Sequence, residues 1–422
     1  MSTQKQNGST IAIIVMFFLF GMVAFVTNMA APFGNIWGYT YSWSGMMGNM
    51  MNFLAYLFMG IPAGKMLETK GYKKTALIAM VIGLIGLFIQ YLSSIFGADV
   101  PVFTYGGQVV ALNLVIYLLG AFVCGFCVCM LNTVVNPMLN LLGGGGNKGN
   151  QLIQAGGSIN SLCGTVTPML VGVLIGEVTD KTAMSDVAPL LFIGMAVFAI
   201  SFIVIYMATI PEPKSAATEA VKSQYSAWSF RHFLFGVGAI FCYVGAEVGI
   251  PAQLNFYVSD PNGINNAVLG GSLAAAYWFL MLCGRLGSTA ISGKISSKLQ
   301  LTTTAALGIL LLVIAVFLPE SIAIGEVPFK CYLIVACGLC TSVMWGAIFN
   351  LAVEGLGKYT AAASGIFMMM VVGGGVWPLI QDLIGVNLGR MTSYWIPIAL
   401  FAYILFFAVA GSKNVNKDIP VE

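Results

Sequence analysis

Residues 110–137 read VALNLVIYLLGAFVCGFCVCMLNTVVNP, and this stretch decides the fold class. It contains no charged residue and, as a helix, is longer than the roughly 30 Å hydrocarbon core of a bilayer. Only helices and closed barrels satisfy every backbone hydrogen bond in lipid. An unbroken apolar run of this length is typical of a helix rather than of a strand with alternating faces. The stretch therefore predicts a transmembrane helix.

The rest of the chain has the same character. Of its 422 residues, 59% are hydrophobic and 8% are charged, and the mean hydropathy is +0.91. A soluble domain carries roughly 25% charged residues, so most of this surface must face lipid or other helices. The net charge of +3 is too small to indicate a nucleic-acid partner. The composition predicts an all-α, multi-pass protein whose surroundings are a lipid bilayer.

About twelve apolar runs long enough to cross a membrane follow one another. We place them at 10–31, 44–66, 74–96, 110–137, 151–176, 188–210, 229–257, 267–291, 300–318, 329–350, 359–384 and 393–411. The polar stretch 1–9 leads into the first run without a small-residue cleavage site. We therefore expect the first run to be retained as a helix.

The basic residues are distributed unevenly between the two sides of the predicted membrane. With both termini on the cytoplasmic side, only Lys181, Lys330 and Arg390 of the 18 basic residues lie outside, and the other 15 (18 − 3) lie inside. Cytoplasmic loops carry an excess of lysine and arginine. The sequence thus predicts a protein of the cytoplasmic (inner) membrane with both termini in the cytoplasm.

The longest polar interruption, Pro211 to Ser229, follows the sixth run. It divides the chain into an N-terminal six-helix bundle (1–210), a cytoplasmic linker (211–228) and a C-terminal six-helix bundle (229–422). Proteins of this layout bind their substrate near the membrane midplane, between the halves. Because one chain holds both halves, we expect a monomer. The short linker leaves no room for the output domain of a sensor, and the sequence shows none of the paired catalytic groups of an enzyme.

The loop between the second and third runs carries basic residues next to glycines. It reads Gly60-Ile61-Pro62-Ala63-Gly64-Lys65 and then Lys70-Gly71-Tyr72-Lys73-Lys74. This loop resembles the signature loop of the major facilitator superfamily, and Gly284-Arg285-Leu286-Gly287 occupies the equivalent place after the eighth run. The resemblance implies the major facilitator fold. It also implies gating or structural roles for Gly64, Lys65, Gly71, Lys73 and Arg285.

Three further segments point to a narrower group. Thr27-Asn28 lies in the first run, Leu131-Asn132-Thr133-Val134-Val135-Asn136-Pro137 in the fourth, and Cys242-Tyr243-Val244-Gly245-Ala246-Glu247 in the seventh. Together they resemble the fucose:proton symporter family, which also contains bacterial glucose/galactose transporters. The resemblance covers nearly the whole chain. It implies import of a hexose, a deoxyhexose or an amino sugar, usually together with a cation.

Two positions depart from the pattern of the fucose symporter. That protein carries an aspartate where this chain has Asn28 and a glutamate where it has Asn132, and those carboxylates handle its proton. An amide does not titrate, so Asn28 and Asn132 cannot bind and release a proton. Coupling to H⁺ by another residue, coupling to Na⁺, and uncoupled facilitation all stay open, as does a different cargo such as an acidic sugar, a peptide or a drug.

Glu247 is the only carboxylate that these boundaries place in the middle of a helix. An ionisable side chain at membrane depth costs several kcal/mol and indicates function. Glu247 is therefore the candidate coupling residue, either as a proton acceptor or as an oxygen ligand for Na⁺. The structural alternative is a hydrogen-bonded glutamate that braces two helices. Beyond a coupling ion, we expect no cofactor.

Sugar recognition needs amides and hydroxyls for the ring hydroxyls, and aromatic faces for the C–H side of the ring. The candidate sugar ligands are Asn28, Asn132, Asn136, Gln154, Asn160, Tyr243, Gln253, Trp278 and Trp345. We find no basic residue placed at the midplane as a counter-ion, because Arg285 lies near the cytoplasmic end of its run; this favours neutral sugars. The cysteines Cys124, Cys127 and Cys129 have no histidine or carboxylate nearby, so packing is expected there and no metal site.

Overall fold

The computed structural model describes residues 3–41, 44, 47–175, 181–208, 210, 212, 225–260, 264–325, 327–416 and 418–421. Its α-helices are α1 (Thr3–Thr40), α2 (Met47–Leu92), α3 (Leu112–Leu142), α4 (Gly146–Ile175), α5 (Ala188–Met207), α6 (Arg231–Ser259), α7 (Ala267–Ile291), α8 (Ser297–Phe317), α9 (Phe329–Thr341), α10 (Met344–Val353), α11 (Thr360–Met369), α12 (Gly373–Leu388) and α13 (Trp395–Phe406). Short helical turns are η1 (Ala227–Ser229), η2 (Gly357–Tyr359), η3 (Met370–Val372), η4 (Thr392–Tyr394) and η5 (Phe407–Gly411). Two antiparallel hairpins pair β1 (Pro101–Tyr105) with β2 (Gln108–Ala111), and β3 (Ala323–Ile324) with β4 (Val327–Pro328).

The helices confirm the predicted membrane spans. Ten stretches of the described residues are long and apolar enough to cross a membrane. One of them, α2, consists of two helices that meet at Gly71, where φ is 81° and the backbone is not helical. α4, with 30 residues, is long enough for a further crossing. These ten spans, one more for the second half of α2 and one more for α4 add up to the twelve expected.

The structure moves one expected boundary and adds local detail inside two of the expected spans. The fourth span begins at Leu112 rather than at residue 110, because Gln108–Ala111 pairs with the preceding strand. The span predicted at 329–350 is confirmed as one crossing, Phe329–Val353, with a local break in its helical hydrogen bonding between α9 and α10, at Ser342 and Val343. The span predicted at 359–384 is interrupted by the single turn η3 between α11 and α12. Most of the linker predicted at 211–228 lies outside the described residues.

The chain forms two compact units. Unit 1 consists of 1–138, 159–220 and 364–369, and unit 2 consists of 139–158, 221–363 and 370–422. They follow the expected two bundles except for two segments, the start of α4 in unit 2 and the end of α11 in unit 1. The division into bundles at 1–210 and 229–422 stays a prediction.

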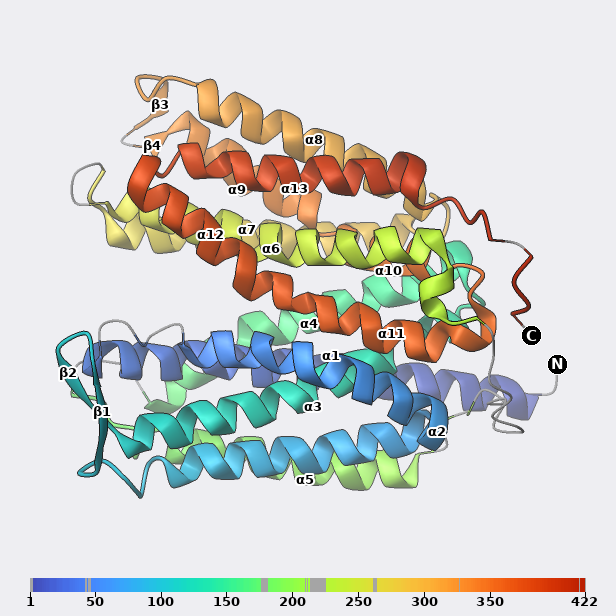
Figure 1. Cartoon of the computed structure of the whole chain (residues 1–422), viewed down its shortest axis with the longest axis horizontal. Helices are drawn as coiled ribbons and strands as arrows, with labels where there is room; N and C mark the ends of the chain where they lie inside the picture. The colour runs from blue at the N-terminus through green and yellow to red at the C-terminus, as the bar shows by residue number, and fades with distance from the viewer. Residues whose placement is uncertain are drawn as a thin grey trace. The chain divides into compact units, whose positions relative to one another are not determined.

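Within unit 2, α6 is the helix on which the others are assembled. It packs against α7, α10, α12 and α13, while α9 lies against α7 and α8 (Figure 1). Tyr243, Ile250 and Leu254 of α6 are fully buried at these contacts. The middle of α6 is therefore surrounded by protein, and a charged side chain there needs a partner within unit 2.

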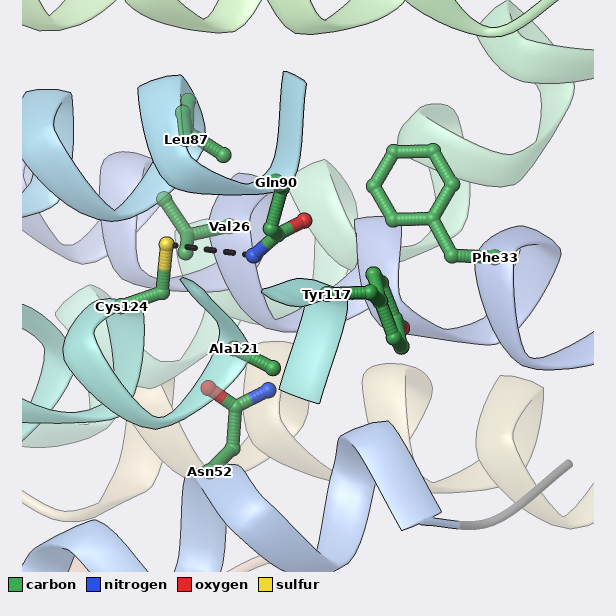
Figure 2. Close-up of a pocket in the computed structure, with 8 residues that line it drawn as sticks. All are labelled: Val26, Phe33, Asn52, Leu87, Gln90, Tyr117, Ala121 and Cys124. Carbon is green, nitrogen blue, oxygen red and sulfur yellow. Dashed lines mark hydrogen bonds between the residues drawn. The ribbon is translucent and has the colours of Figure 1, made fainter. Parts of the chain in front are cut away.

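Within unit 1, α2 packs against α1 and α5, and a small cavity of about 10 Å³ lies among α1, α2 and α3 (Figure 2). It is lined by Val26, Phe33, Asn52, Leu87, Gln90, Tyr117, Ala121 and Cys124. Gln90 Nε2 donates to Cys124 Sγ at 3.4 Å, while the buried Asn52 Oδ1 has no partner among the described residues. A cavity of this size holds about one water molecule, far less than a sugar.

Candidate functional site

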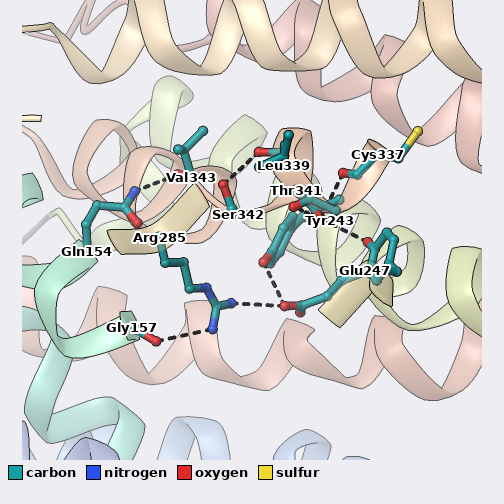
Figure 3. Close-up of polar contacts among 12 residues, drawn as sticks. Gln154, Gly157, Tyr243, Glu247, Arg285, Cys337, Leu339, Thr341, Ser342 and Val343 are labelled. Carbon is teal, nitrogen blue, oxygen red and sulfur yellow. Dashed lines mark hydrogen bonds and ion pairs between the residues drawn. The ribbon is translucent and has the colours of Figure 1, made fainter. Parts of the chain in front are cut away.

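An ion pair between two helices of unit 2 forms the centre of the candidate site (Figure 3). Glu247 lies near the middle of α6, and Arg285 Nη2 of α7 donates to its Oε1 at 3.1 Å. The side chains of Arg285 and Glu247 are 10% and 13% exposed. An isolated charge at this depth is costly, so each residue makes the burial of the other tolerable.

A tyrosine completes the surroundings of the carboxylate. Tyr243 precedes Glu247 by one helical turn, and its hydroxyl donates to Glu247 Oε1 at 2.9 Å. The Tyr243 ring in turn meets the ring of Trp345 edge to face, with centroids 6.2 Å apart. Both donors, Tyr243 and Arg285, use Oε1, so neither of these two contacts engages Oε2.

Arg285 also connects this pair to α4. Its Nη1 donates to the carbonyl of Gly157 at 3.4 Å. Its backbone lies near the end of α7, as the sequence indicates, but its side chain brings the guanidinium to the middle of α6. Arg285, the residue assigned to a gate, therefore contacts the candidate coupling carboxylate of Glu247.

The break between α9 and α10 also belongs to unit 2, and it contacts Gln154 of α4 (Figure 3). Gln154 Nε2 donates to the carbonyl of Val343 at 2.7 Å. Next to the break, the hydroxyls of Thr341 and Tyr277 are 2.9 Å apart. Interrupted membrane helices need such side-chain partners for their backbone and typically occur at transport sites.

Three residues that the sequence analysis did not single out connect α4 to α7. Ser158 and Thr289 share a hydroxyl contact of 3.3 Å, and Gln151 Nε2 donates to the carbonyl of Thr289 at 3.0 Å. Ser158 follows Gln154 by one turn, and Gln151 precedes it by nearly one turn. The polar spacing along residues 151–158 was the available signal, because these residues share one helical face.

The candidate amides of unit 1 bond to their own helices and to α2. Asn132 Nδ2 of α3 donates to the Tyr56 hydroxyl at 2.9 Å, and Asn136 Nδ2 donates to the Asn132 carbonyl at 2.9 Å. This places Asn132 and Asn136 on one face of α3, as their spacing predicts. Asn28 Nδ2 of α1 donates to the Ala24 carbonyl at 2.8 Å. Tyr56 is a further polar residue of this region that the sequence analysis missed.

Three other candidate sugar ligands make contacts that do not include Glu247 or Arg285. Asn160 donates to the Phe20 carbonyl at 3.2 Å within unit 1. Gln253 is 1% exposed, and its amide both donates to Asp382 and accepts from Arg390. Trp278 is 43% exposed and packs edge to face on Tyr277. The amide of Gln253 is engaged at both ends, which is typical of a structural bridge.

The signature loop lies at the kink of α2. Tyr72 and Lys73 begin the second half of α2, and their backbone N–H groups donate to the Glu212 carboxylate at 2.8 and 2.9 Å. Lys73 Nζ donates to the carbonyl of Ala208 at 2.8 Å. Glu212 was not a candidate, although its place directly after the sixth span and between two prolines was a signal. Gly71 provides the positive φ that this turn requires.

The other two loop candidates lie on the first half of α2. A Cβ placed on Gly365 of α11 would lie 2.6 Å from the Cα of Gly64, so the paired glycines let the two helices approach closely. Lys65 is exposed. Among the described residues, no three His, Cys, Asp or Glu side chains come together as a metal site requires.

Comparison with known proteins agrees with this architecture. The sequence pattern of the Major Facilitator Superfamily matches residues 11–378. The chain belongs to the major facilitator superfamily. Its relatives in that superfamily include a glucose/galactose transporter of Brucella abortus, which is 31% identical over 98% of this chain and 96% of that protein. The L-fucose-proton symporter of Escherichia coli is 22% identical over 95% of this chain and 92% of that protein.

A solved facilitator structure confirms the fold. The crystal structure of the Escherichia coli fucose:proton symporter matches with a TM-score of 0.78 and 19% identity, over 96% of this chain and 100% of that one. The expected facilitator fold and the resemblance to the fucose:proton symporter and glucose/galactose transporter family are both confirmed. As a facilitator, the chain is a transporter and not an enzyme.

Proposed function

We propose that this facilitator imports a neutral hexose or deoxyhexose across the cytoplasmic membrane, coupled to a proton through Glu247. Relatives named as glucose/galactose transporters and a fucose-proton symporter support the cargo and the ion. The assignment of Glu247 as the coupling residue rests on its contact with Arg285 and Tyr243 inside the helices of unit 2. The candidate proton acceptor thus already has the partners that stabilise its ionised form.

Coupling follows from the cost of a buried charge. When Glu247 is ionised, its carboxylate balances Arg285; when Oε2 takes up a proton, the carboxylate becomes neutral and its attraction for the guanidinium falls. Breaking a buried ion pair costs about 3–5 kcal/mol, which is enough to bias a transporter between two conformations. Release of the same proton on the other side of the membrane restores the pair, so the cycle is balanced.

Sugar binding is assigned to amides and aromatic rings of both units. In unit 1 the candidates are Asn28, Asn132 and Asn136, whose amide N–H groups bond to the protein. In unit 2, Gln154 and Trp345 lie next to the helix break and to Tyr243. Alternating access then proceeds by rocking of the two six-helix halves that the fold implies.

Orientation and assembly belong to the same proposal. The distribution of basic residues supports an inner-membrane protein with both termini in the cytoplasm, and the presence of both bundles in one chain supports a monomer. Uncoupled facilitation is the second candidate. One observation favours it: amides occupy positions 28 and 132, where the fucose symporter resemblance implies carboxylates.

Uptake into proteoliposomes tests the proposal. Labelled glucose, galactose and fucose would each be supplied with a pH gradient, with a Na⁺ gradient, or with neither. We expect a pH gradient alone to drive accumulation of at least one of these sugars above the outside concentration. Equilibration without accumulation under every gradient would establish uncoupled facilitation. Accumulation driven by Na⁺ alone would show that the coupling ion is Na⁺ and not the proton. A complete lack of uptake would refute the cargo.

A further inference from the structure

An apolar groove in unit 2 lies beside the helix break. It has a volume of about 260 Å³ and is lined by Ile291, Ile295, Leu299, Gln300, Thr303, Thr304 and Val343. These residues come from the end of α7, the start of α8 and the break before α10. Ile291 and Leu299 are 46% and 54% exposed, so the groove is open to its surroundings.

The polar lining residues direct their hydroxyl and amide hydrogen bonds to the protein. The hydroxyls of Thr303 and Thr304 donate to backbone carbonyls one turn earlier in α8, at 2.9 and 2.8 Å. Gln300 accepts from Ser292 at 2.9 Å and donates to the Ile295 carbonyl at 2.8 Å. An occupant therefore meets methyl and methylene groups, which suits a hydrocarbon chain and not a sugar.

One end of the groove is strongly basic. Lys294 lies in the turn between α7 and α8, Lys298 lies in the first turn of α8, and both are exposed. Gln151 of α4 donates to Thr289 of α7, close to this turn, and the exposed Lys148 precedes Gln151 by nearly one helical turn. No aspartate or glutamate occurs in residues 141–176 or 261–319, so the segments that form this end contain no acid to neutralise the lysines.

The charge and the apolar lining together identify one occupant. We propose that this groove binds an anionic phospholipid, with an acyl chain against Ile295, Leu299 and Val343 and the phosphate at Lys294 and Lys298. Basic clusters at the cytoplasmic ends of membrane helices attract anionic headgroups in this way. Lys298 supports this, because a cation in the first turn of a helix is unfavourable unless an anion is also bound there.

Val343 connects the proposed lipid to the break between α9 and α10. The Val343 side chain lines the groove, while its carbonyl accepts the amide of Gln154 at 2.7 Å. An acyl chain packed on Val343 stabilises the position of the break from the lipid side. The site therefore gives this transporter a preference for anionic bilayers that does not depend on which sugar or ion it carries.

Native mass spectrometry of the full-length protein, purified in mild detergent, tests the site with phosphatidylglycerol and phosphatidylcholine as probes. We expect the wild type to retain phosphatidylglycerol with about tenfold preference over phosphatidylcholine. The double variant Lys294→Gln/Lys298→Gln should bind phosphatidylglycerol about 30-fold more weakly, from the usual contribution of each lysine near an anionic surface. The matched variant Lys358→Gln/Lys413→Gln removes the same charge elsewhere in unit 2 and should bind like the wild type.

A second variant separates the groove from its charges. Thr303→Trp fills the groove and keeps both lysines, and it should weaken phosphatidylglycerol binding by about tenfold while the protein stays monodisperse. Equal retention of both lipids by the wild type would overturn the proposal in favour of a nonselective lipid shell. An unchanged affinity in Thr303→Trp would overturn it in favour of headgroup attraction alone, as would displacement of the lipid by inorganic phosphate.

Discussion

The carboxylate of Glu247 receives two donors on one oxygen, and each donor comes from a different place in unit 2. Tyr243 lies one turn away on the same helix, whereas Arg285 reaches across from α7. The first contact follows from the spacing of four residues within a helix. The second depends on how α6 and α7 pack, and nothing in the local sequence specifies it. The sequence therefore identified both charged residues but not their pairing.

Replacing Arg285 tests whether its positive charge stabilises the buried carboxylate of Glu247. We expect Arg285→Gln to lower the free energy of unfolding by about 3 kcal/mol, because it leaves the Glu247 carboxylate without its opposite charge. The double variant Glu247→Gln/Arg285→Gln should recover most of this loss, since two neutral amides can bond to each other. Thermal unfolding of the purified proteins in detergent gives the comparison. A double variant no more stable than Arg285→Gln would contradict a balancing role for the pair.

Among the helices, the kink of α2 shows which contacts the signature loop makes in the structure. The second half of α2 begins after Gly71, and its first N–H groups point at the Glu212 carboxylate. A negative group is favourable there because the helix N-terminus has unpaired donors and a partial positive charge. The motif predicted the turn, but its acidic partner comes from a segment about 140 residues away.

Glu212→Gln tests this contact. The amide keeps an acceptor oxygen but loses the charge, so we expect the free energy of unfolding to fall by about 1 kcal/mol. Glu68→Gln removes the same charge from an exposed position of α2 and should have little effect. Thermal unfolding in detergent again provides the measurement. An equal loss of stability in both variants would show that net charge, and not the Glu212 contact, is responsible.

The interrupted helices mark where prediction from sequence stops. Apolar length correctly placed α7 at 267–291 and α5 from residue 188, because hydrophobic runs of about 20 residues have few alternatives in a membrane. The same criterion correctly gave one span over α9 and α10 but no sign of the local break between them. At this break Gln154, a residue of another helix, donates to the Val343 carbonyl. A partner so distant in the chain leaves no sign in a window of local hydropathy.

For the whole molecule, the twelve expected spans and the excess of basic residues on one predicted side favour one topology. We expect both termini in the cytoplasm. A green fluorescent protein fused to the C-terminus should therefore fluoresce in bacterial cells, and alkaline phosphatase fused there should be inactive. The same phosphatase fused after Lys181, in the predicted outer loop, should be active. Activity of the C-terminal phosphatase fusion would show that the C-terminus lies outside the cytoplasm and that the predicted orientation is wrong.

The most direct test of proton coupling through Glu247 compares the wild type with Glu247→Gln in proteoliposomes. Both would be assayed for accumulation of labelled sugar under a pH gradient and for exchange of sugar at equal pH on the two sides. The wild type should accumulate sugar, whereas Glu247→Gln should only equilibrate it and should retain exchange within about threefold, since exchange needs no net proton movement. Accumulation by Glu247→Gln at the wild-type level would contradict the coupling role of this residue.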